Sequence, residues 1–146
     1  MKKIVKTFVL IVGLMLFTGC GEKVLKCSKE SSSINDEMLM SQVTKITFKN
    51  DKMTKVNLEM DVKLSDSLIK YLDSVLESNL TEFKSIEDIN GFSYTTKKND
   101  DGFTVKIKAN LDKMTDSEKE RFTYVNSSNN YEKEKAEMEE DGYICE

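Results

Sequence analysis

Three cysteines, Cys20, Cys27 and Cys145, are the residues with the clearest potential for chemistry in this 146-residue chain, which contains no histidine. The absence of histidine excludes Ser-His and Cys-His nucleophiles, an imidazole general base and imidazole-bound zinc or haem. Carboxylates are abundant, and two of them are sufficient for glycoside hydrolysis. Because most acids fall on outward strand positions or on a charged terminal helix, we predict that the protein is not an enzyme. A carboxylate-dependent envelope hydrolase, with or without a metal, is the alternative.

Residues 1–20 have the three parts of an export signal. Lys2, Lys3 and Lys6 are basic, residues 8–17 are uninterruptedly apolar, and Thr18 and Gly19 precede Cys20. Ten apolar residues in a helix rise about 15 Å, half of the roughly 30 Å hydrocarbon core of a bilayer. A cleaved leader therefore fits better than the alternative, an uncleaved single-pass anchor.

The segment Leu16-Phe17-Thr18-Gly19-Cys20 resembles the bacterial lipobox. The resemblance implies that residues 1–19 are a signal peptide, that the chain is cut before Cys20, and that Cys20 carries diacylglycerol and palmitate. More than one acyl chain is enough for stable anchoring in the lipid bilayer. The scarcity of arginine is similar to that of low-GC Gram-positive bacteria, which predicts a location on the outer face of the plasma membrane.

The two remaining cysteines lie near the ends of the mature chain. In an oxidising, exported setting an even count favours a disulfide between Cys27 and Cys145. Two free or redox-active thiols are the alternative, although no Cys-x-x-Cys motif is present to lower a thiol pKa. No cofactor is predicted beyond the lipid on Cys20, and no metal ligands are identified.

The net charge of the chain limits the classes of partner that it can bind. Without residues 1–19 the chain has 19 basic residues and 26 acidic ones, a net charge of −7. An acidic body argues against a nucleic-acid partner and against electrostatic attachment to a membrane, because both need clustered cationic groups.

Alternating polarity predicts strands on both sides of one long helix. A short extended segment at 24–27 precedes a polar loop at 28–37, and together with Cys20 they make up the segment 20–38. The main domain, 39–146, with 23–28 as part of it, begins with a hairpin whose second strand alternates without error from Lys55 to Lys63, after a turn at residues 50–52. A second hairpin turns at residues 99–102, with Gly102 expected in the left-handed conformation. A calcium loop is the less favoured interpretation of this turn, because no closing glutamate is placed for it.

The helix signals are of three kinds. Apolar residues recur every three or four positions from Asp66 to Lys84, with Ser65 as N-cap, and this stripe is interpreted as core rather than as a partner-binding face. Thr115 and Glu118 have the spacing of a capping box and predict a short helix to Tyr124. A charged helix over 131–141 should stop at Gly142. The predicted fold is α+β: a single antiparallel sheet of about five strands, with one long and two short helices packed on one face.

The chain resembles the YehR-like small lipoproteins of bacteria. The resemblance is carried by the lipobox, by Leu25-Lys26-Cys27, by the run 46–56, by a hairpin starting at Gly91-Phe92 and by the ending 139–145. It implies an α+β fold and an envelope location, and it brings no established activity or catalytic residue.

We therefore predict a membrane-anchored, extracytoplasmic lipoprotein that acts as a non-catalytic binding module for an unknown envelope protein or small ligand. The outward positions of the strands offer a mixed-charge interaction face, with ordinary solvated sheet as the alternative interpretation. Its residues are Lys55, Asn57, Glu59, Asp61, Lys63, Lys106 and Lys108.

Overall fold

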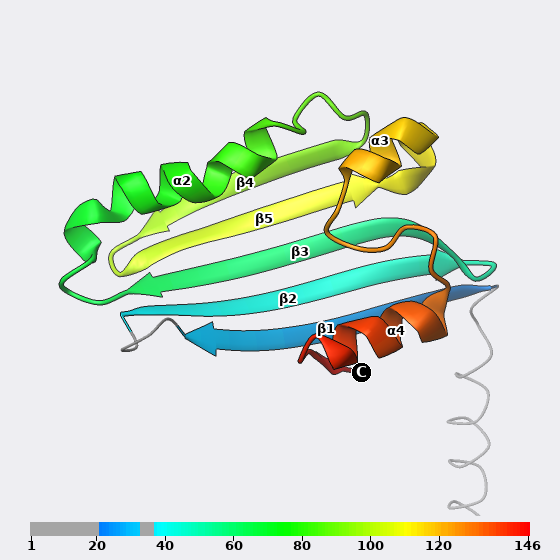
Figure 1. Ribbon diagram of the computed structural model, residues 1–146, viewed down its shortest axis with the longest axis horizontal. Coiled ribbons are helices and arrows are strands. Elements are labelled where there is room, and N and C mark those ends of the chain that lie inside the picture. The colour runs from blue at the N-terminus through cyan, green and yellow to red at the C-terminus, as the bar shows by residue number, and fades with distance from the viewer. Residues whose placement is uncertain (1–20, 33–36) are drawn as a thin grey trace, which may run out of the picture.

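The computed structural model describes residues 21–32 and 37–146, so the predicted signal peptide and the predicted lipidation site at Cys20 lie outside the described residues. Six antiparallel strands form one sheet in the order β4-β5-β3-β2-β1-β6 (Figure 1). The strands are β1 (Glu22–Ser32), β2 (Met38–Lys49), β3 (Lys52–Leu64), β4 (Phe92–Asn99), β5 (Gly102–Asn110) and β6 (Ile144–Cys145). The predicted α+β fold with a single antiparallel sheet is confirmed.

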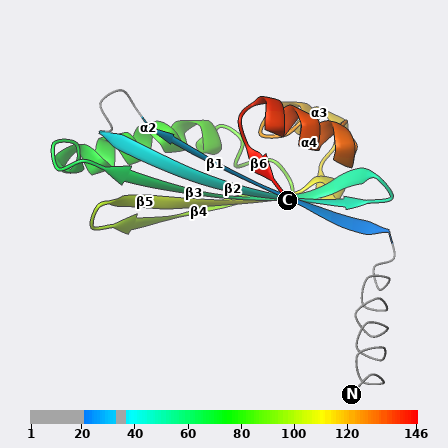
Figure 2. The same cartoon turned by 90° about the horizontal axis from the view of Figure 1, so that it is seen from below.

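The three α-helices among the described residues lie on one side of this sheet (Figure 2). They are α2 (Leu72–Lys84), α3 (Asp116–Arg121) and α4 (Tyr131–Glu140), and two short 3-10 turns, η3 (Ile69–Tyr71) and η4 (Leu111–Lys113), precede α2 and α3. The helix α2 runs beside β4 and β5, whereas α4 runs beside β1 (Figure 1). The sheet therefore has one covered face and one open face.

The core fills the space between the covered face and the helices. Val56, Leu58 and Val62 of β3 point into it, and the apolar stripe of α2 joins it through Leu76 and Phe83. That stripe is core, as predicted. An aromatic cluster joins α2, β4 and the segment after α3, with ring centroids 5.4–6.2 Å apart. Its members are Phe83, Phe92, Tyr94, Phe122 and Tyr124.

Several expected boundaries are wrong. The strand β1 continues to Ser32, where a polar loop was expected from Ser28, because its backbone pairs with β2 along its whole length. The helix expected from Asp66 begins as the 3-10 turn η3 and becomes α2 only at Leu72. The hydroxyl of Ser65 contacts that of Ser67, so it does not cap the helix. The short helix α3 has the predicted capping box but ends at Arg121 rather than at Tyr124.

The two hairpin turns and the end of α4 place particular demands on the residues that form them. Asn50 and Asp51 both have positive φ, 51° and 61°, and close a two-residue hairpin between β2 and β3. Gly102 is not left-handed as expected. It is required instead because a Cβ there would lie 1.8 Å from the carbonyl oxygen of Val62. Gly142, at φ +88°, ends α4 as predicted.

The sixth strand, β6, was not predicted. It has two residues, and it places Cys145 opposite Cys27 at the edge of the sheet. The Cα atoms of this pair are 4.0 Å apart, and the two sulfur atoms lie within bonding distance. The cysteine pair is thus positioned to form the predicted disulfide.

Candidate functional site

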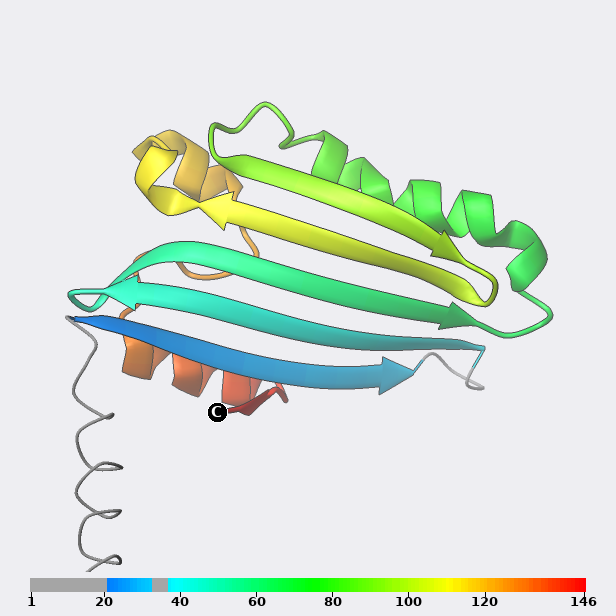
Figure 3. The same cartoon turned by 180° about the vertical axis from the view of Figure 1, so that it is seen from behind.

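The open face of the sheet is the largest surface that the fold leaves without a helix among the described residues (Figure 3). Successive side chains of a strand point to opposite faces, so the burial pattern of each strand identifies its outward positions. In β3 the alternation runs almost without interruption, with every second residue from Met60 to Leu64 buried. The outward residues of five neighbouring strands form the open face.

The structure places all seven residues of the predicted interaction face on this surface. Asn57 lies opposite Lys108, and Glu59 lies opposite Lys106, across the β3–β5 ladder. The Lys106 ammonium is 3.1 Å from the Glu59 carboxylate. In the next row the Thr104 hydroxyl donates a hydrogen bond to Asp61, at 2.5 Å.

Further lysines of the open face come from β1, β2 and the start of β3, and the sequence interpretation missed them. Lys26 lies directly opposite Lys45, and Lys49 lies directly opposite Lys52. The alternation of β2 was already visible in the sequence and could have identified Lys45 and Lys49. The missing information was that β1 and β2 are neighbours of β3, because strand order is not encoded in alternation.

A shallow depression of about 270 Å³ crosses the open face where β3, β5 and β4 meet. Its lining combines hydroxyls, one amide and opposite charges from Glu59, Lys97 and Lys106. A second depression, of about 650 Å³, lies at the end of the sheet where β1 stops, between the ends of β1, β2 and β3. Both depressions are surface features that could accommodate small polar groups.

The fold separates charges that the sequence mixes. Nine lysines occupy outward positions of the open face, against four carboxylates. The lysines are Lys26, Lys45, Lys49, Lys52, Lys55, Lys63, Lys97, Lys106 and Lys108, and the acids are Glu22, Glu30, Glu59 and Asp61. Since the chain as a whole is acidic, its negative charge is concentrated on the helical side and in the connections.

Carboxylate chemistry would need two acids that converge. Two carboxylates do share a partner in the C-terminal segment: the Asn129 amide donates to Glu134 at 2.9 Å and to Glu137 at 2.8 Å. Burial raises the pKa of Glu134, the hydrogen bond from Asn129 lowers it, and the charge of Glu137 raises it again. Glu134 is only 3% exposed, whereas Glu137 is exposed. The arrangement fastens the loop before α4 onto that helix.

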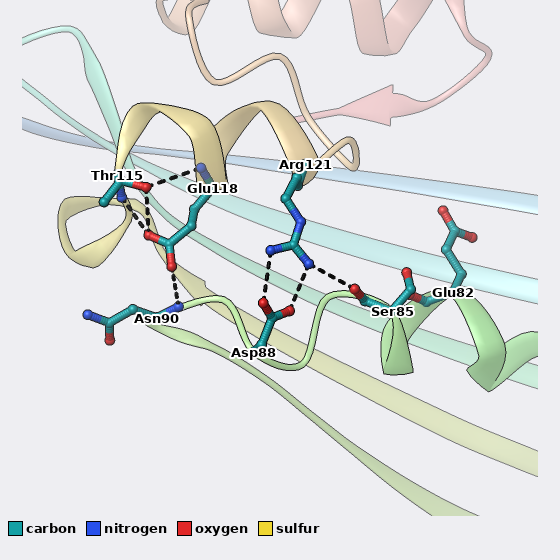
Figure 4. Close-up of polar contacts among 7 residues, drawn as sticks. All are labelled: Glu82, Ser85, Asp88, Asn90, Thr115, Glu118 and Arg121. Carbon is teal, nitrogen blue, oxygen red and sulfur yellow. Dashed lines mark hydrogen bonds and ion pairs between the residues drawn. The ribbon is translucent and has the colours of Figure 1, made fainter.

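The single arginine has a comparable fastening role. Arg121 of α3 donates two hydrogen bonds to Asp88, at 2.9 and 2.7 Å, and one to the carbonyl of Ser85 (Figure 4). Glu118 accepts from the backbone and hydroxyl of Thr115 and from the backbone of Asn90. These hydrogen bonds hold the pKa values of Asp88 and Glu118 below their ordinary values. The network attaches α3 to the loop between α2 and β4.

Residues 21–32 and 37–146 contain no group of three or more His, Cys, Asp or Glu side chains arranged to hold a metal ion. No helix among them combines the length and apolarity needed to cross a membrane.

Comparison with known proteins gives the fold alone. No protein-family model matches the chain. No curated protein matches it either. A protein from Streptococcus pneumoniae TIGR4, whose structure was solved by NMR, superposes with a TM-score of 0.57 at 14% identity. The alignment covers 86% of this chain and 85% of that one, so the similarity extends over nearly the whole fold.

Proposed function

We propose that this protein is an extracytoplasmic bacterial lipoprotein, anchored through Cys20, whose open sheet face is a non-catalytic binding surface for an envelope component. The supporting observation is the open face itself, which carries the seven residues of the predicted interaction face beside further lysines. The YehR-like resemblance remains a prediction that agrees with this proposal.

Little chain separates Cys20, the proposed site of the lipid, from the sheet. Residue 21 is the only residue between Cys20 and β1, and the Gly21 carbonyl accepts a hydrogen bond from the Asn50 backbone at 3.0 Å. A lipid on Cys20 would therefore hold this end of the sheet at the bilayer, since adjacent Cα atoms are about 3.8 Å apart.

The anchor is tested by metabolic labelling with an alkyne analogue of palmitate in the native bacterium. Wild-type protein should be labelled, membrane-bound and lack residues 1–19, whereas Cys20→Ser should be unlabelled and keep its leader. Cys145→Ala is the matched control, because it removes a cysteine outside the lipobox and should remain labelled. An unlabelled wild-type protein would contradict the proposal.

The binding surface is tested by photocrosslinking in intact cells. A photoreactive residue replaces Asn57 on the open face or, as the control, Ser78 on the exposed side of α2. We expect a discrete, reproducible crosslinked product from position 57 and none from position 78. Equal or absent crosslinking at the two positions would contradict a binding role for the open face.

A further inference from the structure

The lysines of the open face are unevenly distributed along the strands. The half nearer to Gly21 carries six of them and two acids, Glu22 of β1 and Glu146 beside Lys26. The six are Lys26, Lys45, Lys49, Lys52, Lys55 and Lys108. The other half has three lysines and three acids, so its charges balance. We name the six lysines the anchor-side patch.

The anchor-side patch is largely uncompensated. Lys26 is 3.3 Å from the Glu146 carboxylate, but the other five lysines form no ion pair within the described residues. The lysines in the other half of the open face are better compensated, because Lys106 pairs with Glu59 and Lys63 lies 4.0 Å from the Asp101 carboxylate.

The arrangement of the patch also costs stability. Like charges directly opposite each other on neighbouring strands repel, and two such pairs occur here, Lys26 with Lys45 and Lys49 with Lys52. Glu22 lies opposite Lys49 on its other side and offsets part of the second repulsion. Asn57 lies between Lys45 and Lys108 and adds no charge. An anionic surface would relieve this repulsion by neutralising several lysines together.

One apolar side chain belongs to the same region. Val24 is 54% exposed on the open face, in the cross-strand row of Thr47 and Lys55. An exposed valine among lysines suits the boundary between lipid headgroups and acyl chains, where apolar and cationic groups both find partners.

We propose that the anchor-side patch docks on anionic lipid headgroups, so that the half of the open face nearer to Gly21 is held against the bilayer while the other half stays free of it. This inference rests on the proposed anchor at Cys20, which places the patch at the membrane. Lipid and basic patch then act as two membrane signals, each reinforcing the other. The acidic helical side would be repelled by the same surface, which fixes the orientation.

The test uses the acylated full-length product, inserted by its own lipid into phosphatidylcholine vesicles with or without phosphatidylglycerol. A water-soluble amine-reactive ester labels exposed lysines, and mass spectrometry gives the labelling rate at each position. We expect Lys45, Lys49 and Lys52 to react several-fold more slowly on phosphatidylglycerol vesicles, and the protection to disappear in high salt. Lys63 and Lys97 are internal controls whose rates should stay unchanged.

A pair of triple variants tests the energetic contribution. Lys49, Lys52 and Lys55 are changed to Gln in one protein, and Lys63, Lys97 and Lys106 in the other, so the charge change is identical. Each lysine near an anionic surface increases the affinity for the membrane about five-fold. The first variant, which lacks three of them, should therefore transfer between phosphatidylglycerol vesicles about a hundred-fold faster than wild type. The second should transfer at close to the wild-type rate.

The outcomes separate this inference from the proposed function. Acylated protein whose lysines label equally on both kinds of vesicle overturns the docking but leaves the anchor intact. A native product without acyl groups overturns the anchor, and the same labelling then tests whether unacylated protein mixed with phosphatidylglycerol vesicles is protected. Protection by soluble polyphosphate but not by phosphatidylglycerol would assign the patch to a soluble polyanion and overturn docking on lipid.

Discussion

Breaking the link between Cys27 and Cys145 should destabilise the whole domain. A disulfide here would close a loop with a sequence separation of 118 residues. In the chain-entropy model a loop of this length lowers the entropy of the unfolded chain by the equivalent of about 5 kcal/mol at 25 °C. Since domains are stable by only about 5–15 kcal/mol, this is a large fraction of the total.

Cys145→Ala is the best single variant for this test. Cys145 is partly exposed, whereas Cys27 is fully buried, so truncating Cys145 removes the bond with little loss of core packing. At roughly 2–4 °C per kcal/mol for a domain of this size, the melting temperature should fall by about 10–20 °C. Calorimetry of wild type and variant, each with and without reductant, measures the effect.

The loss should be greatest in the C-terminal segment. The strand β6 is only two residues long, and α4 is held mainly by Met138, by the Tyr131 ring against Phe48 and by its neighbours in β1 and β6. Hydrogen exchange should therefore accelerate in α4 before it does in β3, because the least-contacted element opens first.

The reductant supplies the control, since it should lower the melting temperature of wild type toward that of Cys145→Ala and leave the variant unchanged. Two results would refute the reasoning. One is a wild-type mass that does not rise by about two daltons on reduction. The other is a melting temperature for Cys145→Ala within about 2 °C of wild type, which corresponds to under about 1 kcal/mol.

Three further predictions concern packing and charge. Gly102→Ala should destabilise by about 1–3 kcal/mol or more in urea unfolding, because its Cβ would overlap the Val62 carbonyl. Glu134→Gln should be more stable than wild type near neutral pH. Burial raises the pKa of Glu134 in the folded protein, so the wild-type protein loses stability as pH rises through that pKa. The difference in stability between the two proteins should therefore vanish in acid. Arg121→Gln should unfold at a lower temperature than wild type near neutral pH, because Arg121 stabilises the ionised Asp88 and lowers its pKa. This stabilisation is lost as pH falls through the lowered pKa, so the difference in melting temperature should be smaller in acid.

Matched variants make these comparisons specific. Gly142→Ala places its Cβ in ordinary van der Waals contact, 3.9 Å from the nearest atom, so it isolates the cost of a positive φ from that of a clash. Glu132→Gln makes the same change at an exposed carboxylate of the same helix and is the matched control for Glu134→Gln. Asp88→Asn should reproduce the loss of acid dependence seen in Arg121→Gln. A Gly102→Ala protein as stable as wild type, or parallel pH profiles for either charge variant, would contradict the explanation given.

The open face was predictable in part, because alternation in β3 and β5 is a local property. Asn57, Glu59 and Lys108 were correctly assigned to one wet side from period two alone. The contribution of β1 and β2 was not, since which strands are neighbours depends on long-range pairing. The net charge of the mature chain does not predict the lysine-rich half of the open face for a related reason: a sum over residues does not say on which face each charge lies.

The amino-acid pattern alone determined the element types, the capping box at Thr115 and the helix stop at Gly142, because these depend on neighbours a few residues away. Only the tertiary structure decided the strand order, the brief β6 and the role of Gly102, which depends on the approach of a backbone forty residues earlier. It also gathered lysines from four strands at the end of the sheet nearer to Gly21 and placed most acids on the other side. Contacts distant in sequence are set by packing the whole core at once, and no local period records them.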